Sequence, residues 1–138
     1  MKRVNVFVDG GARGNPGQAG AGILVENSEG RMIKKILKPL GVATNNEAEY
    51  HAVIIGLENA LDILGGEAKE AEINLYLDSE LVGRQLKGEY RVKSAKLKSL
   101  HQKAMGLLPL FSQVSIINIP REKNKEADKL ANMAMDQA

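Results

Sequence analysis

The chain has 138 residues, 43% of them hydrophobic, which is enough for one domain with its own core. The absence of cysteine excludes a disulfide framework and thiolate chemistry, and a net charge of +2 does not by itself indicate a nucleic-acid binder. No stretch is long and apolar enough to span a bilayer, and the N-terminus lacks a signal-peptide pattern. We therefore expect residues 1–138 to form a single, soluble, cytoplasmic domain that acts as a monomer away from membranes.

The segment 4–11, with the sequence VNVFVDGG, predicts the central strand of a sheet, because residues on both of its faces are mainly apolar. It ends in Asp9, Gly10 and Gly11. An aspartate at the carboxyl end of a central strand lies where open α/β sheets bind their ligands. Asp-Gly is also a common turn pair, so this motif alone leaves both a turn and a ligand site open.

Six glycines and Pro16 lie between positions 10 and 22, which predicts a glycine-rich loop with a tight turn at 14–17. These glycines lack the spacing of a nucleotide-binding fingerprint, so we interpret them first as turn residues. A phosphate contact by the backbone amides beside Asp9 stays open. Residues 21–26 and 31–38 predict two more strands joined by a hairpin loop, so the chain begins with three antiparallel strands.

A helix is predicted to begin after Thr44, with Glu47 in the position that completes a capping box, and to end at the glycines 65–66. Glu49 lies in phase with Val53 and Leu57 on the apolar stripe of this helix. A carboxylate on a core-facing stripe costs desolvation energy unless it is paired or binds a metal. Glu47 is predicted to lie on a solvent-facing side, together with His51 and Glu58.

Residues 73–77 predict a fourth strand that ends on a carboxylate, Asp78. The preceding helix makes the connection long enough for parallel pairing with the first strand. Asp9 and Asp78 would then lie at the same edge of strands ~4.8 Å apart, where their repulsion favours a divalent cation between them. The alternative role for Asp78 is a helix N-cap, since a helix is predicted from Ser79 to Leu86.

The stretch from 84 to 103 is strongly basic, which fits either a solvated helix face or a patch that contacts phosphates. Residues 87–94 predict a linker, and Ser94 is expected to cap a helix over 95–108. Glu89 is the one acidic residue of the stretch. The cations are Arg84, Lys87, Arg91, Lys93, Lys96, Lys98 and Lys103.

A β-branched fifth strand at 114–119, a loop at 120–124 and a helix at 125–135 complete the predicted elements. Asp128 flanks the apolar face of this helix in its first turn, where its charge could simply complement the helix dipole. Together the elements predict an α/β fold. Its five-stranded mixed sheet would have three antiparallel strands followed by two parallel strands, flanked by helices.

Four carboxylates, those of Asp9, Glu49, Asp78 and Asp128, come from two strand ends and two helix starts and can converge at one edge of the sheet. Hard oxygen ligands without cysteine or paired histidines favour Mg²⁺ or Mn²⁺. Two such ions ~4 Å apart can activate a water and stabilise the leaving oxygen of a phosphodiester. The absence of a Ser-His-Asp or Cys-His arrangement argues against covalent hydrolysis.

Four motifs resemble those of type 1 ribonuclease H, in the family's order and spacing and over essentially the whole chain. They are DGG at 9–11 with GNPG at 14–17, TNNEAE at 44–49, DS at 78–79 and NKEADKLA at 124–131. The resemblance implies the ribonuclease H-like fold. It also implies a metal-dependent endonuclease that cuts the RNA strand of RNA–DNA hybrids with two metal ions, leaving 5′-phosphate and 3′-hydroxyl ends.

The resemblance assigns roles to single residues. Asp9 would bridge both metals, Asp128 would help to hold the metal of the attacking water, and Glu49 and Asp78 would hold the metal at the leaving group. Residues expected at the hybrid's minor groove, including its 2′-hydroxyls, are Asn15, Asn45 and Ser79, and Thr44 matches a contact to a DNA phosphate. The remaining expected substrate contacts are Gly10, Gly11, Asn46, Arg121, Lys93 and Lys96.

The chain departs from the family pattern in two places. Arg121 lies in the loop where many members have a mobile histidine, and segment 87–94 is too short for the Trp- and Lys-rich handle of larger bacterial members. These differences bear on rate and affinity, and the resemblance to shorter forms leaves double-stranded RNA open as a second substrate. A binding module with little turnover is one alternative. A related DNA nuclease or integrase domain is another, which Asn15 and Asn45 disfavour.

Overall fold

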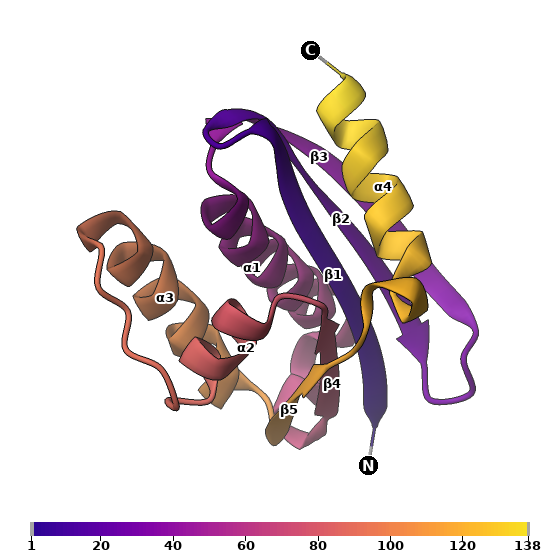
Figure 1. Ribbon diagram of the computed structural model, residues 1–138. Helices are drawn as coiled ribbons and strands as arrows, with labels where there is room; N and C mark the ends of the chain where they lie inside the picture. The colour runs from indigo at the N-terminus through magenta and orange to yellow at the C-terminus, as the bar shows by residue number, and fades with distance from the viewer. Residues whose placement is uncertain (1, 138) are drawn as a thin grey trace.

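A computed structural model describes residues 2–137 and contains one five-stranded sheet with the strand order β3-β2-β1-β4-β5 (Figure 1). The strands are β1 (Arg3–Gly14), β2 (Gly17–Asn27), β3 (Met32–Ala43), β4 (Glu72–Leu77) and β5 (Gln113–Asn118). The α-helices are α1 (Asn45–Leu64), α2 (Glu80–Leu86), α3 (Ala95–Leu107) and α4 (Lys125–Asp136). Short 3₁₀ segments occupy Gly65–Glu70, Leu108–Leu110 and Arg121–Lys123.

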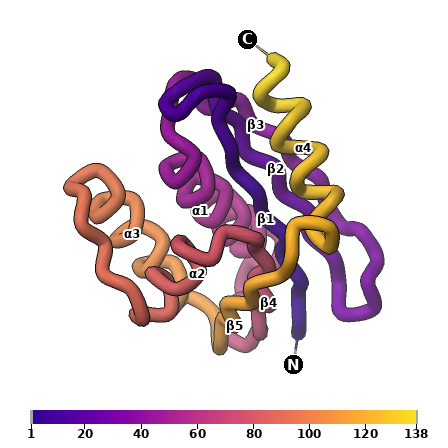
Figure 2. Tube along the Cα trace, in the orientation of Figure 1, coloured from indigo at the N-terminus to yellow at the C-terminus, as the bar shows by residue number. Residues whose placement is uncertain are grey.

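Strands β1 and β3 are each antiparallel to β2, whereas β4 is parallel to both β1 and β5. This confirms the mixed sheet predicted from the sequence. Helices α1 and α4 cover opposite faces of β1 and β2 (Figure 2). Consecutive residues of β2 show the alternation directly: Gly22 faces α4, and Ile23 lies near Gly56 of α1.

The core lies mainly between α1 and the sheet. Val6 and Val8 of β1 and Val53 and Leu57 of α1 are fully buried there. Helix α1 begins with the predicted capping box: the Thr44 hydroxyl accepts from the Glu47 amide, and the Glu47 carboxylate accepts from the Thr44 amide. This cap sets the boundary between β3 and α1, and so determines how the first turns of the helix pack against β1.

The predicted glycine-rich loop at 10–22 is wrong, because most of this segment forms the ends of two long paired strands, but the tight turn predicted at 14–17 is confirmed. Only Asn15 and Pro16 lie between β1 and β2. A Cβ atom on Gly22 would lie 2.3 Å from the Ala127 carbonyl oxygen of α4, and one on Gly10 would lie 2.2 Å from the Ala48 carbonyl oxygen of α1. These glycines therefore let the two helices approach the sheet closely, instead of forming turns.

Helix α3 packs beside α1 on the side away from α4 (Figure 1). The basic segment 87–94, between α2 and α3, has no helix or strand, as the sequence predicted for a linker. Within residues 2–137, no helix combines the length and the apolar character that a membrane crossing requires.

Candidate active site

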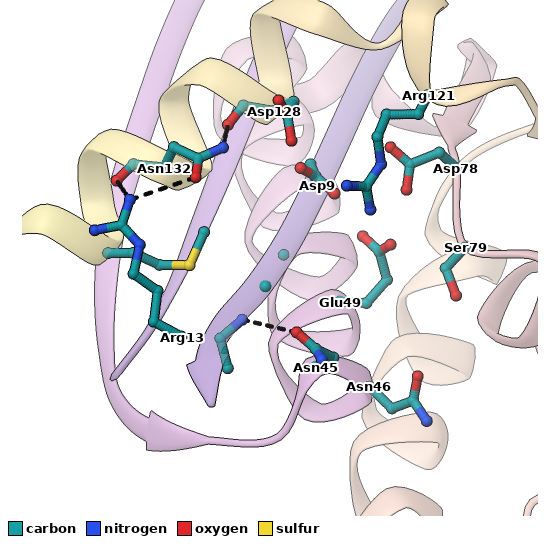
Figure 3. Close-up of a pocket in the computed structure, with 14 residues that line it drawn as sticks. Asp9, Arg13, Asn45, Asn46, Glu49, Asp78, Ser79, Arg121, Asp128 and Asn132 are labelled. Atoms are coloured by element: carbon teal, nitrogen blue, oxygen red, sulfur yellow. Dashed lines mark hydrogen bonds between the residues drawn. The ribbon is translucent and has the colours of Figure 1, made fainter. Parts of the chain in front are cut away.

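Three of the four predicted carboxylates lie together where β1 continues past the end of β4. One carboxylate oxygen from each of Asp9, Glu49 and Asp78 lies within 4.8 Å of the others (Figure 3). Asp9 and Glu49 are buried, and Asp78 is half-buried. Asp128, in the first turn of α4, lines the same cleft. Oxygen ligands brought together from a strand, a helix and a strand end form a candidate divalent-metal site.

Strand register explains why Asp9 and Asp78 meet. The parallel pairing of β1 and β4 aligns Phe7 with Tyr76, and each aspartate lies two residues further along the chain, Asp9 still within β1 and Asp78 directly after β4. The Ser79 hydroxyl, and not Asp78, caps α2 by accepting from the Val82 amide at 3.2 Å. The alternative role of Asp78 as an N-cap is therefore wrong, which leaves its carboxylate available to the cleft.

The electrostatics of the cluster disfavour a fully ionised state without a cation. The pKa of Asp9 is raised to about 8, first by burial, then by the charge of Asp78 and by the neighbouring Asp128. The pKa of Glu49 is raised well above its usual value by burial and by the charges of Asp9 and Asp78. Arg121 opposes both shifts, and its side chain reaches between Asp9 and Asp78 (Figure 3).

The donor set fits a hard divalent cation. The Oε1 atom of Glu49 is buried and has no hydrogen-bond partner among residues 2–137. An unpaired buried carboxylate oxygen is costly unless something outside the protein binds it. Because this oxygen lies beside Asp9 and Asp78, a bound cation such as Mg²⁺ or Mn²⁺ would both neutralise the cluster and occupy the unpaired oxygen.

The cluster lies in a cleft of about 540 Å³. Six of the residues predicted to contact substrate line it: Gly10, Gly11, Asn45, Asn46, Ser79 and Arg121. The cleft is also lined by residues that the sequence did not single out, namely Ala12, Arg13, Asn132 and Met135. Asn132 lies four residues after Asp128, so helical spacing from Asp128 was the signal that could have identified it.

Asn15 and Thr44 lie next to the cleft and support it. The Asn45 side chain accepts from the Ala12 amide at 2.8 Å, and the Asn45 amide donates to the Asn15 side chain at 3.0 Å. Asn15 and Asn45 thereby join the tip of the β1–β2 hairpin to the start of α1. The Thr44 hydroxyl is engaged in the helix cap, accepting from the Glu47 amide at 3.2 Å.

The predicted solvent-facing position of Glu47 is wrong. Its side chain is 8% exposed and its carboxylate lies 3.0 Å from the Lys96 ammonium, which is 76% exposed. Hydrogen bonding to the Thr44 backbone and then to Lys96 lowers the pKa of Glu47. Helical periodicity in α1 could not reveal this, since α3 covers Glu47 only in the folded chain. Lys93 and Lys96 are exposed and are not among the residues that line the cleft.

Comparisons with known proteins agree with this geometry. A family model described as reverse transcriptase-like matches residues 7–134. RNase H1 from the halophilic archaeon Halobacterium salinarum is 40% identical, with 99% of each chain covered and a TM-score of 0.91. LC11-RNase H1, which was isolated from compost and solved in complex with an RNA/DNA hybrid, is 37% identical, with 97% of each chain covered and a TM-score of 0.91.

A third similar structure is the N-terminal RNase H domain of Rv2228c from Mycobacterium tuberculosis. It is 37% identical, with 99% of this chain and 95% of that chain covered and a TM-score of 0.91. The complete mycobacterial protein is described as bifunctional, and the present chain spans 36% of its length.

Proposed function

Because this chain belongs to the type 1 ribonuclease H family, we propose that it is an endonuclease that hydrolyses the RNA strand of RNA–DNA hybrids. The observation that carries the proposal is the convergence of Asp9, Glu49 and Asp78 within 4.8 Å, with Asp128 in the same cleft. The similarity to LC11-RNase H1, solved with a hybrid, supports the choice of substrate. All four carboxylates are present in this chain, which favours catalysis over a binding module.

We propose that the carboxylates hold two Mg²⁺ or Mn²⁺ ions when substrate is bound. Two ions in such a site supply an activated water and stabilise the leaving oxygen, which gives 5′-phosphate and 3′-hydroxyl ends. Asp9, at the centre of the cluster, would contribute to both ions. Asp128 would act on the side of the attacking water, and Glu49 and Asp78 on the side of the leaving group. The unpaired Oε1 of Glu49 supports this assignment.

Substrate binding is assigned to the polar rim of the cleft. We propose that Asn15, Asn45 and Ser79 contact the minor groove, where the 2′-hydroxyl distinguishes RNA from DNA. The carbonyl oxygens of both asparagine side chains are bound to backbone amides, so their NH₂ groups are the donors that would bind substrate. Gly10, Gly11 and Asn46 would contact the strand beside the scissile phosphate.

Phosphate contacts are assigned to Arg121, Thr44, Lys93 and Lys96. Arg121, exposed at the rim, would attract the scissile phosphate, and Thr44 would contact a phosphate of the DNA strand. Lys93 and Lys96, on the α3 side, would contact more distant phosphates. Since all four carboxylates come from one chain, a monomer would suffice for catalysis, and a cytoplasmic location stays a prediction.

The test is cleavage of an end-labelled RNA–DNA hybrid beside RNA–RNA and DNA–DNA duplexes of the same sequence, each with Mg²⁺, Mn²⁺ or a chelator. We expect cleavage of the hybrid's RNA strand with either metal, none with the chelator and none of DNA–DNA. Cleavage of RNA–RNA would add a second substrate. A protein that binds the hybrid but never cuts it would overturn the proposal in favour of a binding module.

A further inference from the structure

Asn124 is a buried side chain that contacts the carboxylate cluster without belonging to it. It lies between the 3₁₀ segment Arg121–Lys123 and α4, and it is 1% exposed. Its Nδ2 atom donates to the Val8 carbonyl oxygen at 2.9 Å and to Asp78 Oδ2 at 3.3 Å. One amide group therefore joins the central strand to the carboxylate that follows β4.

The orientation of this amide follows from chemistry. Both partners are acceptors, so the NH₂ group of Asn124 must face them, and a flipped amide would place its oxygen against two other oxygens. Its Oδ1 atom is then buried without a partner among residues 2–137. Leaving a buried acceptor unpaired lowers the stability of the folded protein. Asn124 also makes no side-chain cap to α4, the contact that usually stabilises an asparagine at this position.

Asn124 forms hydrogen bonds at or next to three of the carboxylate residues. It donates directly to Asp78, and it holds the carbonyl of Val8, the residue before Asp9. The backbone carbonyl oxygen of Asn124 accepts from the Asp128 amide at 3.0 Å, and this hydrogen bond forms part of the first turn of α4. Its two donated hydrogen bonds thus serve the geometry of the cleft at the cost of an unsatisfied Oδ1.

We propose that Asn124 is a positioning residue, which turns the Asp78 carboxylate toward Asp9 and Glu49 and keeps β1, β4 and α4 in register around the metal site. The inference rests on the proposed function of that site. A hydrogen bond from a neighbouring side chain orients a ligating carboxylate and fixes which oxygen faces the cation, and losing such a partner typically costs ~10–100-fold in metal affinity or activity.

The chain offers a matched control. Asn74 of β4 donates through Nδ2 to the Asn5 side chain of β1 at 3.0 Å. It resembles Asn124 in joining β1 to another segment through one amide, but it lies four residues before Asp78 and does not line the cleft. Asn74→Ala therefore reports the cost of losing such a hydrogen bond without disturbing the carboxylates.

The experiment compares the parent chain with Asn124→Leu, Asn124→Ser and Asn74→Ala. Leucine has a similar shape and no donor, and the small serine keeps one donor in case the leucine variant does not fold. Calorimetric titration with Mn²⁺ alone measures metal binding to the free protein, while hybrid cleavage at saturating Mn²⁺ gives kcat and KM. Melting temperatures report stability.

We expect both Asn124 variants to lose ~10–100-fold in Mn²⁺ affinity and to lose kcat, with KM for the hybrid within about 2-fold of the parent. Asn74→Ala should lower only the melting temperature. Folded Asn124 variants that bind Mn²⁺ like the parent would overturn the inference and make Asn124 purely structural. If the parent binds Mn²⁺ but cuts no hybrid, the proposed function fails, and the Mn²⁺ affinities of the variants still decide the role of Asn124.

Discussion

Asp9 of β1 and Asp78, which directly follows β4, each lie two residues beyond the paired residues Phe7 and Tyr76 of these parallel strands. Strand pairing therefore brings two acidic side chains together where only solvent, a cation or another side chain can separate them. Glu49 of α1 adds a third carboxylate within 4.8 Å. The repulsion within this group has consequences for stability that can be measured without any substrate.

The first prediction concerns the pH dependence of metal-free stability. The pKa of Asp9 rises from 3.8 to about 8 on folding, so between these values the folded state holds a proton that the unfolded chain has lost. The free energy of unfolding should then fall as pH rises from 5 to 8, by up to about 1.4 kcal/mol per pH unit for this group. Glu49, shifted in the same direction, adds to the fall. The lowered pKa of Glu47 acts in the opposite sense, but only below about 4.5.

Denaturant unfolding in chelator across this pH range measures the effect. Asp9→Asn should flatten the profile, and Mg²⁺ should restore stability at pH 8 because it binds the ionised cluster. Equal stability of the metal-free parent at pH 5 and pH 8 would mean that the carboxylates do not repel as their positions imply.

The second prediction separates Glu49 from Glu47. Glu49→Gln should collapse metal-dependent turnover with little change in melting temperature, because its carboxylate belongs to the cluster. Glu47→Gln should keep most activity and lower the free energy of unfolding by at most ~1 kcal/mol. The glutamine amide oxygen can still accept from the Thr44 amide, while the interaction with Lys96 is no longer an ion pair. Measuring activity and melting temperature for both variants checks this. If Glu47→Gln lost activity and Glu49→Gln kept it, Glu47 and not Glu49 would be the metal ligand.

The third prediction concerns the basic segment. Lys93, Lys96 and Lys98 are exposed on the α3 side, so changing them to alanine should weaken hybrid binding and lower the log–log salt slope by ~0.9 for each lost phosphate contact. Lys96 is paired with Glu47, so its share should be the smallest. The control is Lys69→Ala, because Lys69 precedes the start of β4, whereas the carboxylate cluster lies beyond the end of that strand. If the triple variant kept the salt slope of the parent, these lysines would contact solvent and not phosphates.

The fourth prediction concerns Arg121. An arginine stays protonated at any working pH, so it attracts phosphate but cannot relay protons as a histidine does. At saturating metal, the pH–rate profile should therefore lack a limb near 6.5. Neither histidine lines the cleft, and His101 is bound to the Gln85 carbonyl oxygen at 3.2 Å. A limb near 6.5 that disappears when His51 or His101 is changed would contradict this assignment.

Much of the fold follows from local patterns in the sequence. Apolar alternation identified β1, and the capping box at Thr44 placed the start of α1, because both depend on residues close in the chain. The boundaries of β1 and β2 could not be placed in the same way. The glycines between 10 and 22 indicate a loop when read locally, and the role of Gly10 and Gly22 in letting α1 and α4 approach the sheet exists only after packing.

The site was predictable where residue type alone carries the chemistry. Four carboxylates at element ends indicated a metal site, and the structure places them around one cleft. The surroundings of Glu47 and Asn124 were not predictable, because the partners of each are distant in the chain. Glu47 pairs with Lys96, which lies 49 residues later. Asn124 bonds to Asp78 and Val8, which lie 46 and 116 residues earlier. Periodicity describes one helix at a time and cannot show what another segment brings to its surface.

The most direct test of the account is the paired measurement of hybrid cleavage and unfolding for Asp78→Asn. The new amide oxygen can still accept from Asn124, and one of the repelling charges is removed, so metal-free stability at pH 8 should be unchanged or higher. Cleavage of the RNA strand in Mg²⁺ should be abolished. A variant that unfolds would make the cluster a structural network, and a variant that cuts hybrids at the parent's rate would show that catalysis does not pass through these carboxylates.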